Sequence, residues 1–224
     1  MLLLLLQCVF LITAYRTDSA DVIQWIRLNE HVQMCSNVTF IVNCKDHTDA
    51  MCSNFLPNVG DECFSILTHV TNTYEIPRHV PREILFHIPA SFLKSEERKN
   101  HVNALLNKVL KEKKGIITYE DMGHHYDFEN DANFVMHRWK GSTHTEPINL
   151  IHAKIEPYKE WYRHYFGDTF PDKISWSLGT FAIDTKQIQK YPLSLYEELL
   201  EETKMSIGVE VCHYLERTWM PMWS

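Results

Sequence analysis

Four side chains near the C-terminus have types and spacing that could do chemistry. Glu210, His213 and Glu216 lie three residues apart, and Arg217 follows four residues after His213. Residues at this spacing occupy adjoining faces of one helix. One carboxylate could then act as a general base while His213 or Arg217 orients it. A helix stabilised by internal salt bridges is the competing interpretation.

A second group of candidate residues is a polar run rich in histidine and carboxylates. It contains His124, His125, Asp127, Glu129, Asp131 and His137. Imidazole with carboxylate suits zinc, manganese or iron, so Asp127, Asp131 and His124 are candidate ligands for a divalent metal such as manganese. The spacing matches no established ligand motif, and a solvated polar loop explains the same residues.

The sequence contains no complete motif for a nucleophile or a phosphate loop. There is no Gly-x-Ser-x-Gly elbow, no His-Glu-x-x-His and no glycine-rich phosphate loop. Asn58-Val59-Gly60 precedes a predicted helix, and backbone amides at a helix start can bind an anion. More often such a turn only caps the helix. The net charge of -7 argues against a nucleic-acid partner, which would need a basic surface.

The chain has 224 residues and begins with an apolar run over residues 1–14. This run is short for a bilayer span and predicts a secretory signal peptide within residues 1–20, cleaved after Ala14 or Ala20. An uncleaved membrane anchor is the alternative. Residues 21–224 are then expected to form a single domain that is secreted or lies in the lumen of the secretory pathway.

The cysteines fit that compartment. Cys8 would leave with the signal peptide, and the close group of Cys35, Cys44, Cys52 and Cys63 predicts one or two disulfides of unspecified connectivity. Several of them could instead be small buried hydrophobic residues. Asn37 begins the one glycosylation sequon.

Strand and helix patterns alternate along the chain. Apolar strand patterns occur at residues 38–42, 82–88, 116–119 and 177–183, with a less regular one at 21–26. Helical patterns occur at residues 61–74, 102–110, 158–166, 185–190, 194–204 and 209–219. This alternation predicts an α/β fold in which crossover helices join parallel strands.

Segments in this order resemble a family called domain of unknown function 3431. Leu-Pro-Asn-Val-Gly-Asp-Glu at residues 56–62 resembles its Pro-Asn-Val-Gly-Arg-Glu motif, and residues 84–87 stand where it has a Phe-Leu-Gln-Gly strand. Residues 179–183 resemble its Gln-Phe-Ala-Val strand, and residues 210–219 resemble its terminal Leu-Glu-Arg-x-Trp helix. The resemblance implies a three-layer α/β/α sandwich similar to the nucleotide-diphospho-sugar transferase (GT-A-like) fold.

The resemblance implies a glycosyltransferase-like protein that binds a nucleotide sugar at the carboxyl ends of the strands, where open α/β sheets place ligands. The expected site has three parts: donor contacts from Asn58, Gly60 and Glu62, an acceptor side formed by Trp176, Gly179 and Tyr196, and Glu210 or Glu216 as base with His213. A nucleotide sugar or a glycan is the expected partner.

Two positions depart from the family pattern. Asp61 replaces the arginine of the motif, and no acid follows His87 in the segment at residues 88–91, where typical transferases of this fold carry a metal-binding acidic pair. Such a protein would be metal-independent, would use acids such as Asp127 and Asp131, or would have lost catalysis. The alternative functions are a catalytically inactive binding domain of the same fold and a His-rich metal-binding protein.

Overall fold

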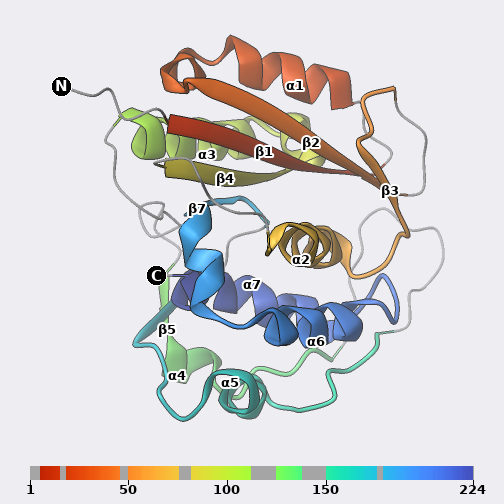
Figure 1. Cartoon of the computed structure of the whole chain (residues 1–224). Coiled ribbons are helices and arrows are strands. Elements are labelled where there is room, and N and C mark those ends of the chain that lie inside the picture. Colours follow the sequence, from red (N-terminus) through yellow and green to blue (C-terminus); the bar gives the residue numbers. More distant parts are fainter. Residues whose placement is uncertain are drawn as a thin grey trace.

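A five-stranded sheet organises the molecule (Figure 1). The computed structural model of the chain describes residues 6–15, 19–45, 50–75, 82–111, 125–137, 150–175 and 179–223. The strands are β1 Leu6–Tyr15, β2 Asn37–Lys45, β3 Asn54–Leu56, β4 Arg82–Pro89 and β7 Phe181–Asp184, in the order β3-β2-β1-β4-β7. The first four are parallel, and β7 is antiparallel to β4. The predicted α/β class is confirmed.

β1 is the central strand of this sheet. It pairs with β2 on one side and β4 on the other, so that Phe10 lies opposite both Phe40 and Phe86. A central parallel strand is covered on both faces and therefore forms a continuous apolar run, as the core of a signal peptide also does. The prediction that residues 1–20 form a leader outside the domain is therefore wrong for Leu6–Tyr15. Among the described helices, none has the length and apolarity that a bilayer span needs.

Helices cover both faces of the sheet and complete three layers (Figure 1). On one face lie α1 Ser19–Leu28 and α3 Glu96–Leu106, and on the other lie α2 Asp61–Thr73, α6 Leu193–Thr203 and α7 Glu210–Trp223. Successive strand residues point to opposite faces, so Phe10 packs with the first pair of helices and Leu11 with the second group. The strand predicted at residues 21–26 is wrong, because this segment belongs to α1.

A further layer covers the outer side of α7. It consists of α4 Phe128–Asp131, α5 Tyr158–Phe166 and a two-stranded sheet of β5 His125–Asp127 and β6 Lys173–Ser175. Aromatic rings fill this contact: the Tyr214 ring centroid lies 5.4 Å from that of Tyr158 and 5.5 Å from that of Trp161. The predicted aromatic helix at residues 158–166 is confirmed.

Shorter helical segments connect these elements. They are η1 Glu30–Met34, η2 Ala90–Lys94, η3 Asn107–Lys111 and η5 Thr185–Lys190. The last of these agrees with the helical pattern at residues 185–190. The strand predicted at residues 116–119 lies outside the described residues.

Two disulfides secure the β1 and β2 side of the sheet. Cys8 in β1 is bonded to Cys35, and Cys44 in β2 is bonded to Cys52. Cys44–Cys52 lies within the predicted cysteine group, whereas the partner of Cys35 is a residue that was expected to leave with a leader. Disulfides of this kind persist in an oxidising environment.

Candidate functional site

A buried chain of polar side chains joins the carboxyl-terminal halves of the parallel strands. It consists of Thr13 of β1, Asn43 of β2, Ser65 of α2 and His87 of β4, and we call it the strand-end network. Thr13 Oγ1 lies 2.8 Å from Ser65 Oγ and 2.9 Å from His87 Nε2. Asn43 Nδ2 donates to Ser65 Oγ at 2.8 Å. Three strands and one helix are therefore tied together below the edge of the sheet where α/β folds bind ligands.

Burial lowers the pKa of His87 to about 3, so its imidazole is neutral. Its Nδ1 faces the carbonyl oxygen of Gly179, which can only accept a hydrogen bond. Nδ1 must therefore carry the proton, and Nε2 accepts from the Thr13 hydroxyl. Thr13 Oγ1 also lies within hydrogen-bond distance of Ser65 Oγ, which accepts from Asn43, so each of the four side chains has a partner in the network. A fully satisfied buried network of this kind fixes geometry rather than supplying a mobile proton.

Lys45 fixes the turn that leads into α2. This lysine is only 2% exposed, and its ammonium donates to Val59 O at 2.6 Å and to Asp61 O. Burial lowers the pKa of Lys45. Gly60 adopts φ 57°, and a Cβ at this position would lie 2.5 Å from the backbone oxygen of Thr203. The turn that the sequence indicated as a donor contact is thus held from both sides in a conformation that requires glycine.

Carboxylates gather where α2 begins. Asp61, Glu62 and Glu216 of α7 interact electrostatically, and we call them the helix-start carboxylates. Burial, followed by the charge of Glu62, raises the pKa of Asp61 well above its usual value. Burial, followed by the charge of Glu216, raises the pKa of Glu62. Carboxylates that raise one another's pKa in this way favour a bound cation or a shared proton.

Gly179 and His213 complete this region. The backbone at Gly179 passes close to Glu62: a Cβ on Gly179 would lie 3.4 Å from Glu62 Cγ. Gly179 also has φ 72°, a conformation that favours glycine. His213 Nδ1 lies 3.2 Å from Glu216 Oε2. The structure therefore brings together five of the sequence-predicted site residues, from segments far apart in the chain: Gly60, Glu62, Gly179, His213 and Glu216.

The other predicted base, Glu210, lies elsewhere. Its side chain is fully buried and accepts hydrogen bonds from Met136 N at 2.5 Å, Ala153 N at 3.0 Å and Tyr214 Oη at 3.0 Å. His152 Nδ1 lies 3.3 Å from it. Glu210 thus faces the outer layer, whereas Glu216 on the same helix interacts with α2.

The remaining predicted residues are dispersed. Tyr196 is buried in the core, where its hydroxyl donates to Ile188 O at 2.7 Å and accepts from Trp223 Nε1 at 3.1 Å. Asn58 is partly exposed in the turn before α2, and Asn37 is exposed at the start of β2. Trp176 lies outside the described residues.

The predicted metal ligands are placed only in part. Asp131 pairs with Arg217, whose Nε lies 2.8 Å from Asp131 Oδ2. Asp127 is exposed at the end of β5, and His124 lies outside the described residues. Within the described part of the chain, the group that brings three potential metal ligands together is instead His152, Glu156 and Glu210.

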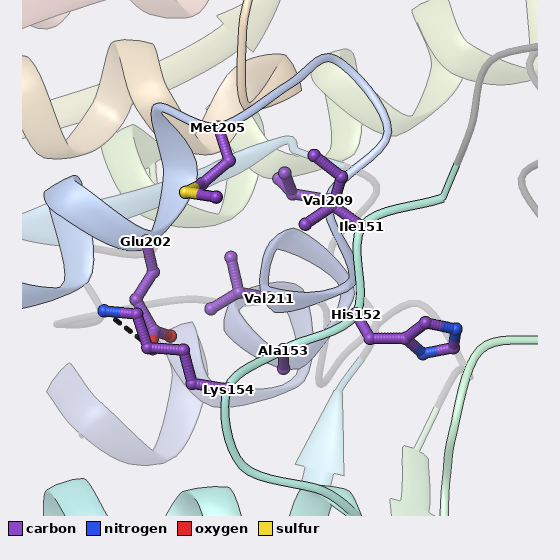
Figure 2. Close-up of a pocket in the computed structure, with 8 residues that line it drawn as sticks. All are labelled: Ile151, His152, Ala153, Lys154, Glu202, Met205, Val209 and Val211. Atoms are coloured by element: carbon purple, nitrogen blue, oxygen red, sulfur yellow. Dashed lines mark ion pairs between the residues drawn. The ribbon is translucent and has the colours of Figure 1, made fainter.

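A small pocket lies beside this second group (Figure 2). Its walls are mainly apolar and are formed by Ile151, His152, Ala153, Lys154, Glu202, Met205, Val209 and Val211. The cavity measures about 50 Å³, which is too small for a nucleotide sugar. The imidazole of His152 points away from the other labelled side chains.

Sequence reasoning missed the strand-end network, Lys45 and the pair of His152 and Glu156. One signal was available: Thr13, Asn43, Lys45 and His87 are polar residues within strands that are otherwise apolar. Buried polar residues of this kind need specific partners and therefore indicate a network. No protein-family model, no curated protein and no solved structure matches this chain.

Proposed function

We propose that this protein binds a nucleotide sugar at the carboxyl ends of β1 and β4 and acts as a glycosyltransferase-like enzyme of the GT-A-like fold class. The strand order supports this location. The chain passes from β1 to β2 on one side and later places β4 on the other, so the two strands flank a topological switch point. Open α/β sheets bind their ligands at such points.

The observation that carries the proposal is the convergence of Gly60, Glu62, Gly179 and Glu216 at this edge. These residues come from three of the four segments that resemble the transferase-like family. Glu216, with His213 beside it at 3.2 Å, is the proposed general base for the acceptor hydroxyl. His213 is its positioning residue.

The helix-start carboxylates also determine whether the donor binds together with a metal ion. A diphosphate next to Asp61, Glu62 and Glu216 would be repelled unless a divalent cation separates the charges. Carboxylate oxygens suit manganese or magnesium, which would neutralise the diphosphate when bound. The proposed donor complex is therefore metal-dependent, with Asp61 and Glu62 as the cation contacts.

A binding domain without catalytic activity is the second candidate. It is favoured by the loss of the motif arginine at Asp61 and by His87, whose two ring nitrogens are engaged by Thr13 and Gly179. Either function fits the proposed location in the secretory pathway or outside the cell, because both disulfides would persist there.

Thermal unfolding with nucleotide sugars, with and without Mn²⁺, tests the proposal. A donor at about 100 times its Kd stabilises the fold by about 2.7 kcal/mol, which corresponds to a Tm rise of roughly 5–10 °C for a chain of this size. Glu62→Gln should abolish this rise, whereas the control Glu201→Gln, at an exposed pair with Lys204, should keep it.

The proposal fails if no nucleotide sugar raises the Tm of the wild-type protein in either condition. If a donor binds, turnover by Glu216→Gln decides the role of the base. Full turnover in that variant would refute the base assignment. Donor binding without turnover in the wild type would favour the inactive binding domain.

A further inference from the structure

His152, Glu156 and Glu210 direct their ligand atoms to one point on the outer side of α7. His152 Nδ1 lies 2.6 Å from Glu156 Oε1 and 3.3 Å from Glu210 Oε2. One donor atom from each residue lies within 4.8 Å of the others. An imidazole nitrogen and two carboxylate oxygens are ligand types that metal ions bind together in proteins.

Backbone pairing holds the ligands in place. Ile151 N donates to Gly208 O at 2.8 Å, and Glu210 N donates to Ile151 O at 2.9 Å. These two bonds bind the segment that carries His152 to the start of α7. These bonds hold the backbone of His152 next to the start of α7, where Glu210 lies.

Glu210 is fixed before any ion arrives. Three donors contact its oxygens: two backbone amides, from Met136 and Ala153, and the Tyr214 hydroxyl. Groups that orient a ligating carboxylate in this way raise metal affinity, because the side chain loses less conformational entropy when the metal binds. Glu210 is fully buried, whereas His152 and Glu156 are 53% and 34% exposed, so an ion can enter from solvent.

The charge around this group is not balanced by the nearest described basic side chains. Lys154 lies 3.9 Å from Glu202, on the pocket side, and Arg217 pairs with Asp131. The two carboxylates of Glu156 and Glu210 thus face each other across a single imidazole. Two carboxylates that lie this close together attract a cation.

We propose that His152, Glu156 and Glu210 bind a divalent transition-metal ion. The imidazole selects Zn²⁺ or Co²⁺ over Mg²⁺ and Ca²⁺, which prefer oxygen ligands alone. Three protein ligands leave at least one coordination position for water or a ligand, as in open zinc sites. This site is separate from the nucleotide-sugar site, because Glu210 and Glu216 face different layers of the molecule.

Metal titration of chelator-treated protein tests the proposal. Zn²⁺ should raise the Tm of the wild type, and Co²⁺ should give visible absorption from a nitrogen and oxygen site. His152→Ala and Glu156→Gln, both at exposed side chains that can change without loss of the fold, should each weaken Zn²⁺ binding by at least about tenfold. Tyr214→Phe, which removes a support for Glu210, should weaken it by about 10–100-fold.

His164→Ala is the matched control, because His164 is 50% exposed and lies 3.9 Å from Glu198. This variant should bind Zn²⁺ as the wild type does. The proposal is overturned if Zn²⁺ does not stabilise the wild type, or if His152→Ala and Glu156→Gln bind it with unchanged affinity. Glu62→Gln should bind Zn²⁺ as the wild type does. The metal titration therefore tests this site independently of the nucleotide-sugar proposal.

Discussion

Replacing His87 by glutamine should change how the stability of the protein depends on pH. Burial lowers the pKa of His87 to about 3 in the folded state, from 6.5 for an exposed histidine. The unfolded chain therefore binds more protons below pH 6.5, and folding stability falls as the pH decreases. Because one pKa unit corresponds to about 1.4 kcal/mol, this residue alone should cost the wild type about 2 kcal/mol between pH 7 and pH 5.

The assay is urea unfolding of the wild type and His87→Gln at pH 7, 6 and 5. At pH 7 the variant should be less stable by about 1–3 kcal/mol, because Thr13 and Gly179 lose well-placed partners. The difference between the two proteins should then shrink by about 2 kcal/mol as the pH falls to 5. His69 and Lys45 also lower the pKa of His87, and they are present in both proteins, so their own effects largely cancel.

Parallel stability curves for the two proteins would refute the reasoning. They would mean that His87 is accessible to protons in the folded state, or that the strand-end network is not closed. A second check is available by NMR. The imidazole of His87 should stay neutral at pH 5, whereas a titration near pH 6.5 would contradict the buried network.

Three further changes have expected outcomes. In urea titrations, Cys8→Ser should lower the free energy of unfolding by about 3.5 kcal/mol and Cys52→Ser by about 2.5 kcal/mol. The first loss is larger because the Cys8–Cys35 bond spans 27 residues and the Cys44–Cys52 bond spans 8. Equal losses would contradict the loop-length argument. Gly60→Ala should cost more than about 3 kcal/mol because its Cβ would strike backbone, whereas Gly167→Ala, with open space around it, should cost about 1 kcal/mol by the same measurement. Removing residues 1–20 should abolish folding, as judged by circular dichroism and solubility, and a folded truncated protein would exclude a central β1.

Much of the fold could be predicted because its signals are local. The helix at residues 158–166 and the strand at residues 82–88 have regular apolar patterns that short segments determine by themselves. The first strand was misread because burial on both faces produces an unbroken apolar run, and such a run does not tell a central strand from a leader. Only its pairing with β2 and β4 resolves the ambiguity, and pairing is not local.

The site residues that belong to a sequence motif could be predicted, whereas those brought together only by the packing of distant segments could not. Gly60 and Glu62 belong to a recognisable segment, and the structure places them beside Gly179 and Glu216. His152 carries no motif, because its proximity to Glu210 depends on backbone bonds between segments about sixty residues apart. Helical spacing also offered Glu210 and Glu216 as alternative bases beside His213, but α7 is covered on two sides and the two carboxylates face different layers.

The central position of β1 has a consequence for biosynthesis. This strand is made before both of its partners, and one of them, β4, ends only at Pro89. At roughly 5–20 residues per second, the ribosome needs on the order of 4–15 s to add the residues from the end of β1 to the end of β4. During that interval an apolar segment is exposed on the growing chain, so the nascent polypeptide is more prone to aggregate than the finished protein and depends most on chaperones at this stage.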